Sequence, residues 1–337
     1  MYGGRFRRLI RLTILCGLMT VTGACDPGAP VATRPYSALV IFGDSLSDNG
    51  NLTGELNLVP PPPYAPGRYS NGDIWVDHLA RHFDLRAEPA YLGGTNFAHG
   101  AAGTDRGAAD IRGVPVGFNL REQVNWYLDL YTPRGDELFV IWSGGNDLFD
   151  MLAGVDGLTP QSSADNIAIA INVLYDAGAR RFFVMTAPDL SVTPRYRNSS
   201  RKGVAREMTM SFNNALLTHL DLLDGLRDIH IARLDVAPLL RDLVDNPPAG
   251  ISNTTDPAWS GDLFGYLGEG EVVPDPDSYL YWDRQHPTRM GHAFIAQYAI
   301  EAITASLEQT PTTPVEARPE QSHFAASSLF WYRYLGL

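Results

Sequence analysis

Short apolar runs alternate along the chain with longer segments in which apolar residues recur every three or four positions. The short runs are rich in β-branched and aromatic residues, which is typical of buried strands, and they lie in segments 37–43, 137–147, 180–189 and 229–236. The period of the longer segments predicts helices over residues 73–83, 161–179, 201–227 and 286–307. Apolar strands that alternate with helices indicate a parallel sheet with helices packed on both faces.

Polar residues directly follow two of the predicted strands. Ser45 lies in "FGDSLSDNGN" after the first strand, and Asn146 lies in "SGGND" after the second. The functional groups of open parallel sheets gather at the carboxyl ends of the strands. We therefore expect Ser45 and Asn146 to lie at the same edge of the sheet, although serine and asparagine are also common turn residues.

A serine that acts as a nucleophile needs a base, a group that orients the base, and donors that stabilise an oxyanion. The segment "YWDRQHPT" places Asp283 three residues before His286, so that an aspartate can orient a histidine that accepts the serine proton. Pro287 disfavours a helical conformation of His286 and predicts that it lies at the mouth of the last helix. The glycine-rich segment "TNFAHGAAG" and the side chain of Asn146 offer donors for an oxyanion.

The first 25 residues differ in composition from the rest of the chain. Four arginines precede the uncharged segment 12–24, which is too short to span a bilayer comfortably and is typical of an export signal that ends at Cys25. The small residues before Cys25 resemble a bacterial lipobox, although Thr22 stands where leucine is usual. This resemblance implies a protein anchored in the bacterial cell envelope through a lipidated Cys25, on the periplasmic side or at the surface. Cleavage near Ala24 would instead give a secreted protein.

Composition divides the remainder of the 337-residue chain into two parts. Residues 36–308 have an ordinary globular composition and are long enough for one large α/β domain. Residues 309–337 combine a linker rich in proline and threonine with an aromatic tail. Both cysteines, Cys16 and Cys25, lie in the predicted leader, so the sequence after it has neither a disulfide nor a cysteine metal site.

The charge of the chain narrows the classes of partner. The formal net charge is −12, and without the four leader arginines 22 basic residues remain against 38 acidic ones, a net charge of −16. A surface of this charge repels polyphosphate and anionic lipid, so we expect no nucleic-acid partner. Zwitterionic and neutral lipids are not disfavoured in this way.

In four separate blocks the sequence resembles the GDSL lipase/esterase family, whose members are also called SGNH hydrolases. The segments "FGDSLSDNGN", "GGTNFAHGAAG", "GGND" and "DRQHP" match the blocks in the family's order, and the resemblance covers about residues 39–306. It implies a three-layer α/β/α sandwich with a central, mostly parallel, five-stranded sheet of flavodoxin-like order. Ala101 departs from the family, in which a second glycine frequently follows the one at Gly100.

The resemblance also implies a role for one or two residues in each block. Ser45 would attack an ester carbonyl, His286 would carry the proton, and Asp283 would orient the histidine. The backbone amides of Ser45 and Gly100 and the side chain of Asn146 would form the oxyanion hole. The resemblance implies neither a metal nor an organic cofactor.

Several classes of ester substrate are compatible with the sequence. We expect an exported serine ester hydrolase, a carboxylesterase or lipase, that acts through an acyl-serine intermediate on small-molecule or lipid acyl esters. Within the same chemistry, the alternatives are a lysophospholipase or phospholipid:sterol acyltransferase and a carbohydrate O-deacetylase. A non-catalytic surface lipoprotein is an alternative of a different class, and the presence of every block residue argues against it.

Overall fold

The computed structural model describes residues 34–56, 60–105, 118–261 and 270–309. The predicted export signal with its Cys25, and residues 310–337 of the predicted linker and tail, lie outside the described residues. None of the described helices is long and apolar enough to cross a membrane.

Four of the apolar segments form a parallel sheet, as predicted. Its strands, in spatial order, are β1 (Leu39–Gly43), β2 (Leu138–Trp142), β3 (Arg181–Met185) and β4 (His230–Leu234). Every residue of β1 and β2 is buried, because helices cover both faces of the sheet. Since the strands are parallel, their carboxyl ends share one edge, and the polar segments that follow them converge there.

The described sheet has four strands, whereas we expected five. The place of a fifth strand, beside β1, is taken by segment 95–99, which forms backbone hydrogen bonds with β1 but only an isolated bridge, between Ile41 and Asn96. The Asn51 side chain donates to the carbonyl oxygens of Asn96 and Ala98 (both 2.8 Å), and the Asn96 side chain accepts from the Ala98 N–H (3.0 Å). These bonds take backbone groups that a continuous strand would use.

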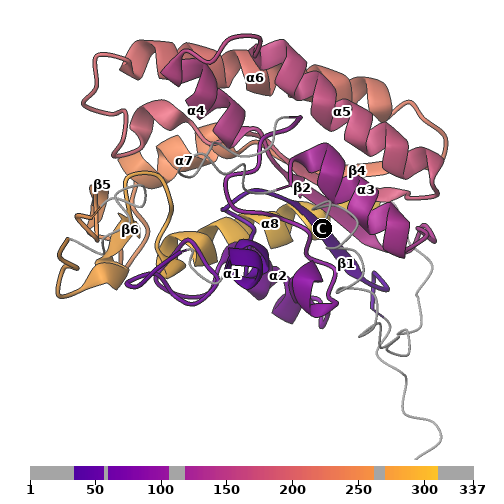
Figure 1. Cartoon of the computed structure of the whole chain (residues 1–337), viewed down its shortest axis with the longest axis horizontal. Coiled ribbons are helices and arrows are strands. Elements are labelled where there is room, and N and C mark those ends of the chain that lie inside the picture. The colour runs from indigo at the N-terminus through magenta and orange to yellow at the C-terminus, as the bar shows by residue number, and fades with distance from the viewer. Residues whose placement is uncertain (1–33, 57–59, 106–117, 262–269, 310–337) are drawn as a thin grey trace, which may run out of the picture. The chain divides into compact units, whose positions relative to one another are not determined.

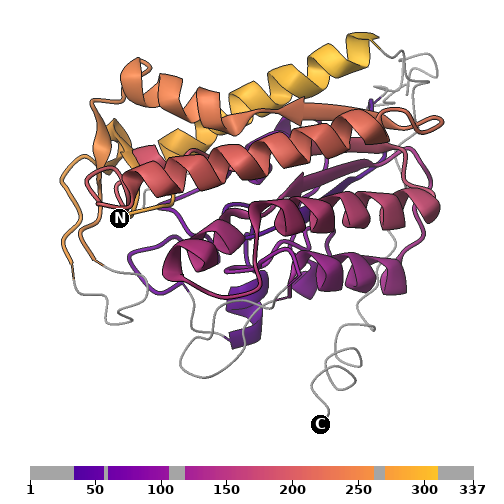
Figure 2. The same ribbon diagram turned by 90° about the horizontal axis from the view of Figure 1, so that it is seen from above.

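The helices form one layer on each face of the sheet. Their bounds are α1 (Asn51–Leu56), α2 (Trp75–His82), α3 (Leu120–Leu130), α4 (Gly145–Ala153), α5 (Pro160–Asp176), α6 (Lys202–Leu223), α7 (Val236–Asp245) and α8 (Arg289–Gln309). In Figure 1, α4, α5 and α6 lie on one side of the sheet, and α1, α2 and α8 lie on the other. Viewed from above, α6 and α8 run in a similar direction (Figure 2).

The alternation of side chains along the strands divides the core in two. Val40 and Phe42 of β1 belong to an apolar cluster that includes residues of α3, α4, α5 and α6. Leu39 and Ile41 of the same strand belong to a second cluster, which includes residues of α2 and α8. The predicted three-layer α/β/α sandwich is therefore confirmed, with the sheet buried between two apolar layers.

Helix α8 begins three residues later than predicted, at Arg289 rather than at His286. Before it, the Trp282 N–H donates a hydrogen bond to the carbonyl oxygen of His286 (2.8 Å), which holds this segment in a turn. Oγ1 of Thr288 then accepts a hydrogen bond from the Gly291 N–H (3.1 Å), as the side chain of an N-cap residue does. His286 therefore lies just outside the helix.

A two-stranded sheet that the sequence did not predict pairs β5 (Asn253–Pro257) with β6 (Tyr279–Tyr281). Strand β6 leads directly into the segment that carries Asp283 and His286. Both strands lie at the left of Figure 1. The small sheet thus anchors one end of the segment that supplies the predicted base.

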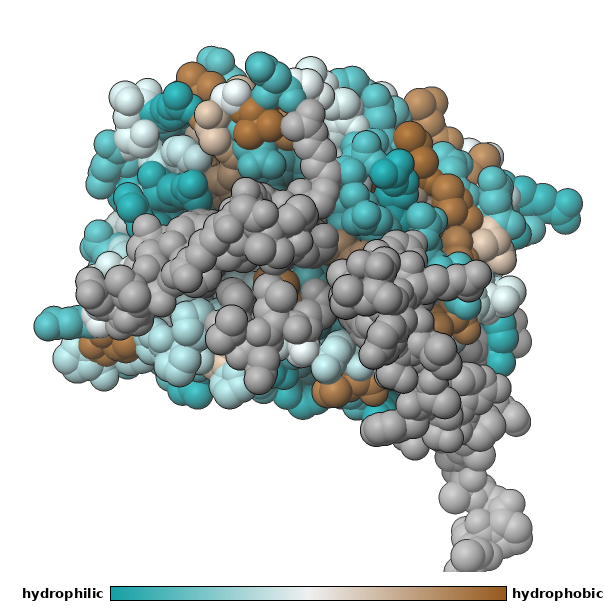
Figure 3. Space-filling model, in the orientation of Figure 1, coloured by the Kyte–Doolittle hydropathy of each residue, from teal (hydrophilic) through white to brown (hydrophobic). Residues whose placement is uncertain are grey.

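Among the described residues, few large apolar side chains are exposed close to one another. On the face that Figure 3 shows, most hydrophobic residues lie among hydrophilic ones, and a short row of them runs down the upper right. Ile169 and Val173, which are 54% and 39% exposed, lie one turn apart on α5. A small exposed apolar group of this kind is normal on protein surfaces and does not by itself indicate a docking site.

Candidate active site

The turn that carries Ser45 begins where β1 ends. The carbonyl oxygen of Asp44 accepts hydrogen bonds from the N–H groups of Ser47 and Asp48 (both 2.9 Å). Oδ1 of Asp44 also accepts one from the Leu46 N–H (3.0 Å). These bonds close a tight turn at the carboxyl end of the sheet, and Ser45 lies within it, at the edge where we expected it.

Ser45, His286 and Asp283 meet at this edge of the sheet. Oγ of Ser45 lies 2.8 Å from Nε2 of His286, and Nδ1 of His286 lies 2.6 Å from Oδ2 of Asp283. Because the carboxylate can only accept, Nδ1 carries the proton and Nε2 is left to accept one from the serine. All three side chains are buried. The structure therefore brings the three predicted residues into one hydrogen-bonded chain.

The spacing of Asp283 and His286 is set by a local turn. Oδ1 of Asp283 accepts hydrogen bonds from the backbone N–H groups of Gln285 (2.8 Å) and His286 (2.7 Å). An aspartate that bonds its own backbone two and three residues later forms a turn of defined shape. This turn places Oδ2 against the imidazole of His286, which explains why a separation of three residues suits the pair.

The Asp283 carboxyl stays ionised although it is buried. Burial by itself would raise its pKa, but the neighbouring charge of His286 and hydrogen bonds from His286 and Tyr64 outweigh burial and lower the pKa below its usual value. The Tyr64 hydroxyl donates to Oδ2 over 2.6 Å. An ionised Asp283 can stabilise the positive charge that His286 gains when it takes a proton.

The predicted oxyanion donors differ in their placement. Asn146, the second residue of α4, lines the pocket beside Ser45, and its Nδ2 donates one hydrogen bond to the Ala102 carbonyl (2.9 Å). That bond orients the amide and leaves its second N–H for a ligand. The Gly100 N–H instead donates to Oδ2 of Asp48 (2.8 Å), so it is already engaged, and Gly100 is not among the pocket residues. The expectation for the Gly100 amide therefore does not match the geometry.

Gly100 has a steric role that the sequence did not reveal. A Cβ atom at this position would lie 2.0 Å from the hydroxyl oxygen of Tyr69. The Tyr69 ring packs against the imidazole of His286, with 5.4 Å between ring centroids. Only glycine lets Tyr69 take this position, so Gly100 supports the histidine through Tyr69.

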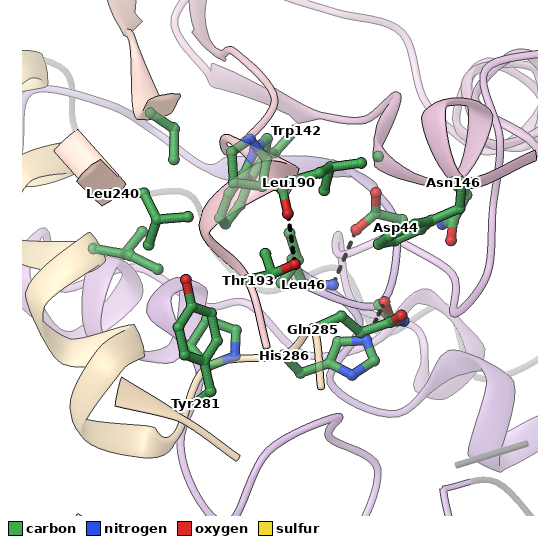
Figure 4. A pocket seen from close by; sticks show the side chains of 17 residues that line it. Asp44, Leu46, Trp142, Asn146, Leu190, Thr193, Leu240, Tyr281, Gln285 and His286 are labelled. Carbon is green, nitrogen blue, oxygen red and sulfur yellow. Dashed lines mark hydrogen bonds between the residues drawn. The ribbon is translucent and has the colours of Figure 1, made fainter. Parts of the chain in front are cut away.

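A pocket opens next to Ser45 at the carboxyl ends of the strands (Figure 4). It encloses about 580 Å³ of space free of protein atoms, part of it open to solvent. The residues that line it are Asp44, Ser45, Leu46, Trp142, Gly145, Asn146, Phe149, Pro188, Leu190, Thr193, Val236, Leu240, Tyr281, Gln285, His286, Pro287 and Ile295. Apolar and aromatic side chains dominate this wall, which suits an apolar group of a ligand.

Asp44 is a second buried carboxyl at the pocket. Burial raises its pKa to about 7, and the hydrogen bond from the Leu46 N–H and the nearby His286 offset burial only in part. Near neutral pH this group therefore exchanges a proton while it lines the pocket beside Ser45. Sequence reasoning assigned Asp44 no function, because its pKa depends on burial.

Sequence reasoning also missed Tyr64 and Tyr69, which contact Asp283 and His286. Both lie in segment 56–72, whose four consecutive prolines are typical of a surface loop. Both tyrosines are buried. Two tyrosines in a proline-rich loop were the feature of the sequence that could have indicated a buried role. Within the described part of the chain, no cluster of three or more His, Cys, Asp or Glu side chains could hold a metal ion.

Comparisons with known proteins agree with this geometry. A model of the family described as GDSL-like lipase/acylhydrolase matches residues 39–299. A protein of Pseudomonas putida described as "uncharacterized protein in trpE-trpG intergenic region" is 27% identical over 346 residues, which cover 94% of this chain and 55% of that protein. The thermolabile hemolysin of Vibrio parahaemolyticus is 27% identical over 283 residues, which cover 78% of this chain and 63% of the hemolysin.

A third relative matches over nearly its whole length. The phosphatidylcholine-sterol acyltransferase of Aeromonas hydrophila is 26% identical over 342 residues, which cover 87% of this chain and 97% of that enzyme. The chain thus spans only 55% and 63% of the length of the first two relatives. The matched region 39–299 makes up most of the chain and contains Ser45, Asn146, Asp283 and His286. This chain therefore belongs to the GDSL-like lipase/acylhydrolase family.

Proposed function

We propose that this chain hydrolyses carboxylic esters, with Ser45 as the nucleophile. The observation that carries the proposal is the hydrogen-bonded chain from Ser45 Oγ to His286 Nε2 (2.8 Å) and from His286 Nδ1 to Asp283 Oδ2 (2.6 Å). Over these distances a proton can pass from the serine to the histidine while the oxygen attacks a carbonyl carbon. Membership of a lipase/acylhydrolase family supports ester chemistry.

The first half of the reaction forms an acyl-serine. Ser45 Oγ attacks the ester carbonyl carbon and gives its proton to His286 Nε2, and Asp283 stabilises the resulting imidazolium. The carbonyl oxygen becomes an oxyanion, for which the Ser45 N–H and the free N–H of the Asn146 side chain are the donors. As the bond to the alcohol breaks, His286 returns the proton to the leaving oxygen.

The second half repeats the steps with water. A water molecule gives a proton to His286 and attacks the acyl carbon, and the oxyanion forms again against the same donors. His286 then protonates Ser45 Oγ as the carboxylic acid leaves. Each donor of this kind contributes about 3–4 kcal/mol to transition-state stabilisation, so loss of the Asn146 amide should slow both halves.

The pocket supports an ester with an apolar acyl group. Leu190, Val236, Leu240 and Ile295 line it, so an alkyl chain attached to the carbonyl carbon would be buried against apolar atoms. The similarity to the phosphatidylcholine-sterol acyltransferase of Aeromonas hydrophila supports a lipid ester as the substrate. Transfer of the acyl group to a sterol in place of water would use the same residues.

We further propose, from the sequence alone, that the protein is exported and anchored through Cys25. The basic start of the chain, the apolar segment 12–24 and the small residues before the cysteine support this location. Metabolic labelling with a radioactive fatty acid tests it: the wild-type protein should carry label in the membrane fraction, and Cys25→Ala should carry none. Equal labelling of both proteins would overturn lipidation at this residue.

A covalent probe and a substrate series test the nucleophile together. A fluorophosphonate should add to Ser45, located by peptide mass spectrometry, and the wild type should hydrolyse p-nitrophenyl acyl esters. Ser45→Ala should lose the label and at least about a thousandfold of kcat. Ser47 lies two residues away in the same turn, with its Oγ bonded to Nε1 of Trp75 (3.1 Å) rather than to His286. A correctly folded Ser47→Ala should keep the label.

Labelling or hydrolysis that survives Ser45→Ala would end the assignment of the nucleophile. The acyl-length profile of the same series separates a short-chain esterase from a lipid enzyme. Lysophosphatidylcholine, with and without a sterol acceptor, then separates hydrolysis from acyl transfer.

A further inference from the structure

An arginine contacts two residues that line the pocket, one of which directly precedes His286 in the chain. Nη1 of Arg195 donates a hydrogen bond to Oε1 of Gln285 (2.6 Å), and Gln285 precedes His286 and lines the pocket. Figure 4 shows Gln285 beside His286. The guanidinium carbon of Arg195 also lies 4.7 Å from the ring centroid of Phe149, another pocket residue. Arg195 is therefore held between two residues of the pocket wall.

Several contacts fix the Arg195 side chain in this position. Its backbone N–H donates to the carbonyl oxygen of Arg284 (2.9 Å), which ties its turn to the segment that carries Asp283 and His286. Its guanidinium lies over Phe149 and over Tyr196, whose ring stacks on Phe149 with centroids 6.0 Å apart. Aromatic faces attract a cation and restrict its motion. The guanidinium is thus oriented before any ligand binds.

The charge of this arginine is not neutralised by a carboxylate within the described residues. Arg241, by contrast, pairs with Asp189 (2.7 Å), and Arg68 pairs with Asp77 (2.8 Å). Of the five N–H donors of the Arg195 guanidinium, the bond to Gln285 uses one. Arg284, the residue after Asp283, is exposed and likewise forms no ion pair with a described residue. Two arginines without a paired carboxylate in the described part of the chain, on turns joined by a backbone hydrogen bond, favour an anionic ligand.

The reaction itself decides which part of an ester this arginine would meet. His286 must give its proton to the oxygen of the leaving alcohol, so that oxygen lies within bonding distance of Nε2 in the transition state. Gln285, which lines the pocket directly before His286 in the chain, holds the Arg195 guanidinium, whereas Leu190, Val236 and Leu240 form the apolar wall. The acyl group and the alcohol of the ester therefore face different surroundings.

We infer that Arg195 selects esters whose alcohol carries a phosphate group. This inference rests on the proposed function. An acyl group fills the apolar wall, and a phosphate on the alcohol accepts hydrogen bonds from the guanidinium of Arg195, which is well suited to such oxygens. Two sources share this chemistry: a lysophospholipid and a water-soluble acyl ester of a phosphorylated alcohol.

Matched substrates test the inference. Wild type and variants are assayed with 1-hexanoyl-glycerol-3-phosphate and 1-hexanoyl-glycerol, which have the same acyl group and differ only in the phosphate. Arg195→Gln should lower kcat/KM for the phosphate ester at least tenfold, mainly through KM, and should leave the neutral ester within about twofold. Arg195→Lys keeps the charge but loses the planar fork, so it should fall between wild type and Arg195→Gln.

Arg206 provides the control for a change in net charge. It is exposed on α6, and Arg206→Gln should leave both substrates unchanged. The same comparison with 1-palmitoyl-glycerol-3-phosphate and 1-palmitoyl-glycerol separates the sources. A loss confined to the palmitoyl phosphate ester supports a lysophospholipid, and a loss confined to the hexanoyl one supports a soluble ester.

Equal losses on the phosphate and neutral esters would overturn the inference, because Arg195 would then merely support the loop of His286. Unchanged kinetics on both would overturn it as well. If a fluorophosphonate labels Ser45 but the wild type shows no preference for the phosphate ester, the inference fails and the proposed function stands. If neither labelling nor hydrolysis occurs, the proposed function itself fails.

Discussion

The Tyr64 hydroxyl and Nδ1 of His286 donate hydrogen bonds to the same oxygen of Asp283, Oδ2, each over 2.6 Å. The other oxygen, Oδ1, accepts from the backbone N–H groups of Gln285 and His286. A buried carboxylate needs such a full set of donors, since water cannot solvate it. Tyr64, which lies 219 positions before Asp283, is thus part of the support for the catalytic histidine that we propose.

Tyr64→Phe should weaken the enzyme without removing its nucleophile. Loss of a hydrogen bond to a charged group costs about 1.5–3 kcal/mol, so we expect a roughly tenfold lower kcat/KM at neutral pH and a higher pKa of Asp283. Steady-state kinetics on a p-nitrophenyl ester measure the effect. Tyr175→Phe removes a hydroxyl that bonds the Arg227 carbonyl (2.9 Å), remote from the site in sequence, and should leave activity unchanged. Equal activity of Tyr64→Phe and wild type would contradict the proposed support.

Gly100→Ala should disturb the histidine through Tyr69. The added Cβ would lie 2.0 Å from the Tyr69 hydroxyl oxygen, so the ring must move away from His286. We expect at least a tenfold loss of kcat together with a lower melting temperature. Gly203→Ala is the control, because nothing lies within 4 Å of a Cβ at that position on α6, and alanine favours helix. A Gly100→Ala variant with wild-type kcat would show that Tyr69 packing is unimportant.

Ala101→Gly should stabilise the protein. Ala101 has a φ of 63°, in the left-handed region that costs a residue with a side chain roughly 1–2 kcal/mol. Glycine relieves this cost, and its larger freedom in the unfolded chain offsets part of the gain, so we expect up to about 1 kcal/mol. Urea denaturation of wild type and variant measures the difference. The neighbouring Ala102 is buried and has no positive φ, so the control Ala102→Gly should destabilise the protein. If Ala101→Gly also destabilises the protein, the backbone of Ala101 is not strained.

Asp44 should make the folded state less stable as the pH rises. Its pKa is about 7 in the folded protein and near 3.8 when unperturbed, so between these values the folded state holds a proton that the unfolded state has lost. The free energy of unfolding therefore falls as pH increases from about 4 to 7 and changes no further above that range. A shift of this size corresponds to about 4 kcal/mol in total.

Asp44→Asn should remove this dependence. Its side-chain oxygen can still accept the hydrogen bond from the Leu46 N–H, and it never ionises. Denaturant unfolding at pH 5 and pH 8 should show the variant gaining stability over wild type, with the larger gain at pH 8. If Asp44→Asn gained more stability at pH 5 than at pH 8, the pKa of Asp44 in the folded protein would not be raised.

Most helices and strands could be predicted from the sequence, because the residue pattern that indicates each of them is local. Apolar runs predicted β1 to β4, and three-to-four-residue periodicity predicted α2, α5, α6 and α8 to within a few residues. The fifth strand was expected only from the family resemblance, and the described sheet has four. Segment 95–99 forms backbone hydrogen bonds with β1, but the side chains of Asn51 and Asn96 take other backbone groups of the segment, and that competition depends on a contact between distant segments.

The residues Ser45, Asp283 and His286 could be named from the sequence because short blocks carry their chemistry, and a turn within one block already aims Asp283 at His286. The residues that hold these three in place could not be predicted from the sequence. Tyr64, Tyr69 and Arg195 reach the site only because the chain path brings loops together, and no local pattern encodes that path. The same holds for Gly100, whose amide faces Asp48 and whose missing side chain makes room for Tyr69. Local chemistry thus identified the reacting groups, whereas burial and long-range packing decided what holds them in place.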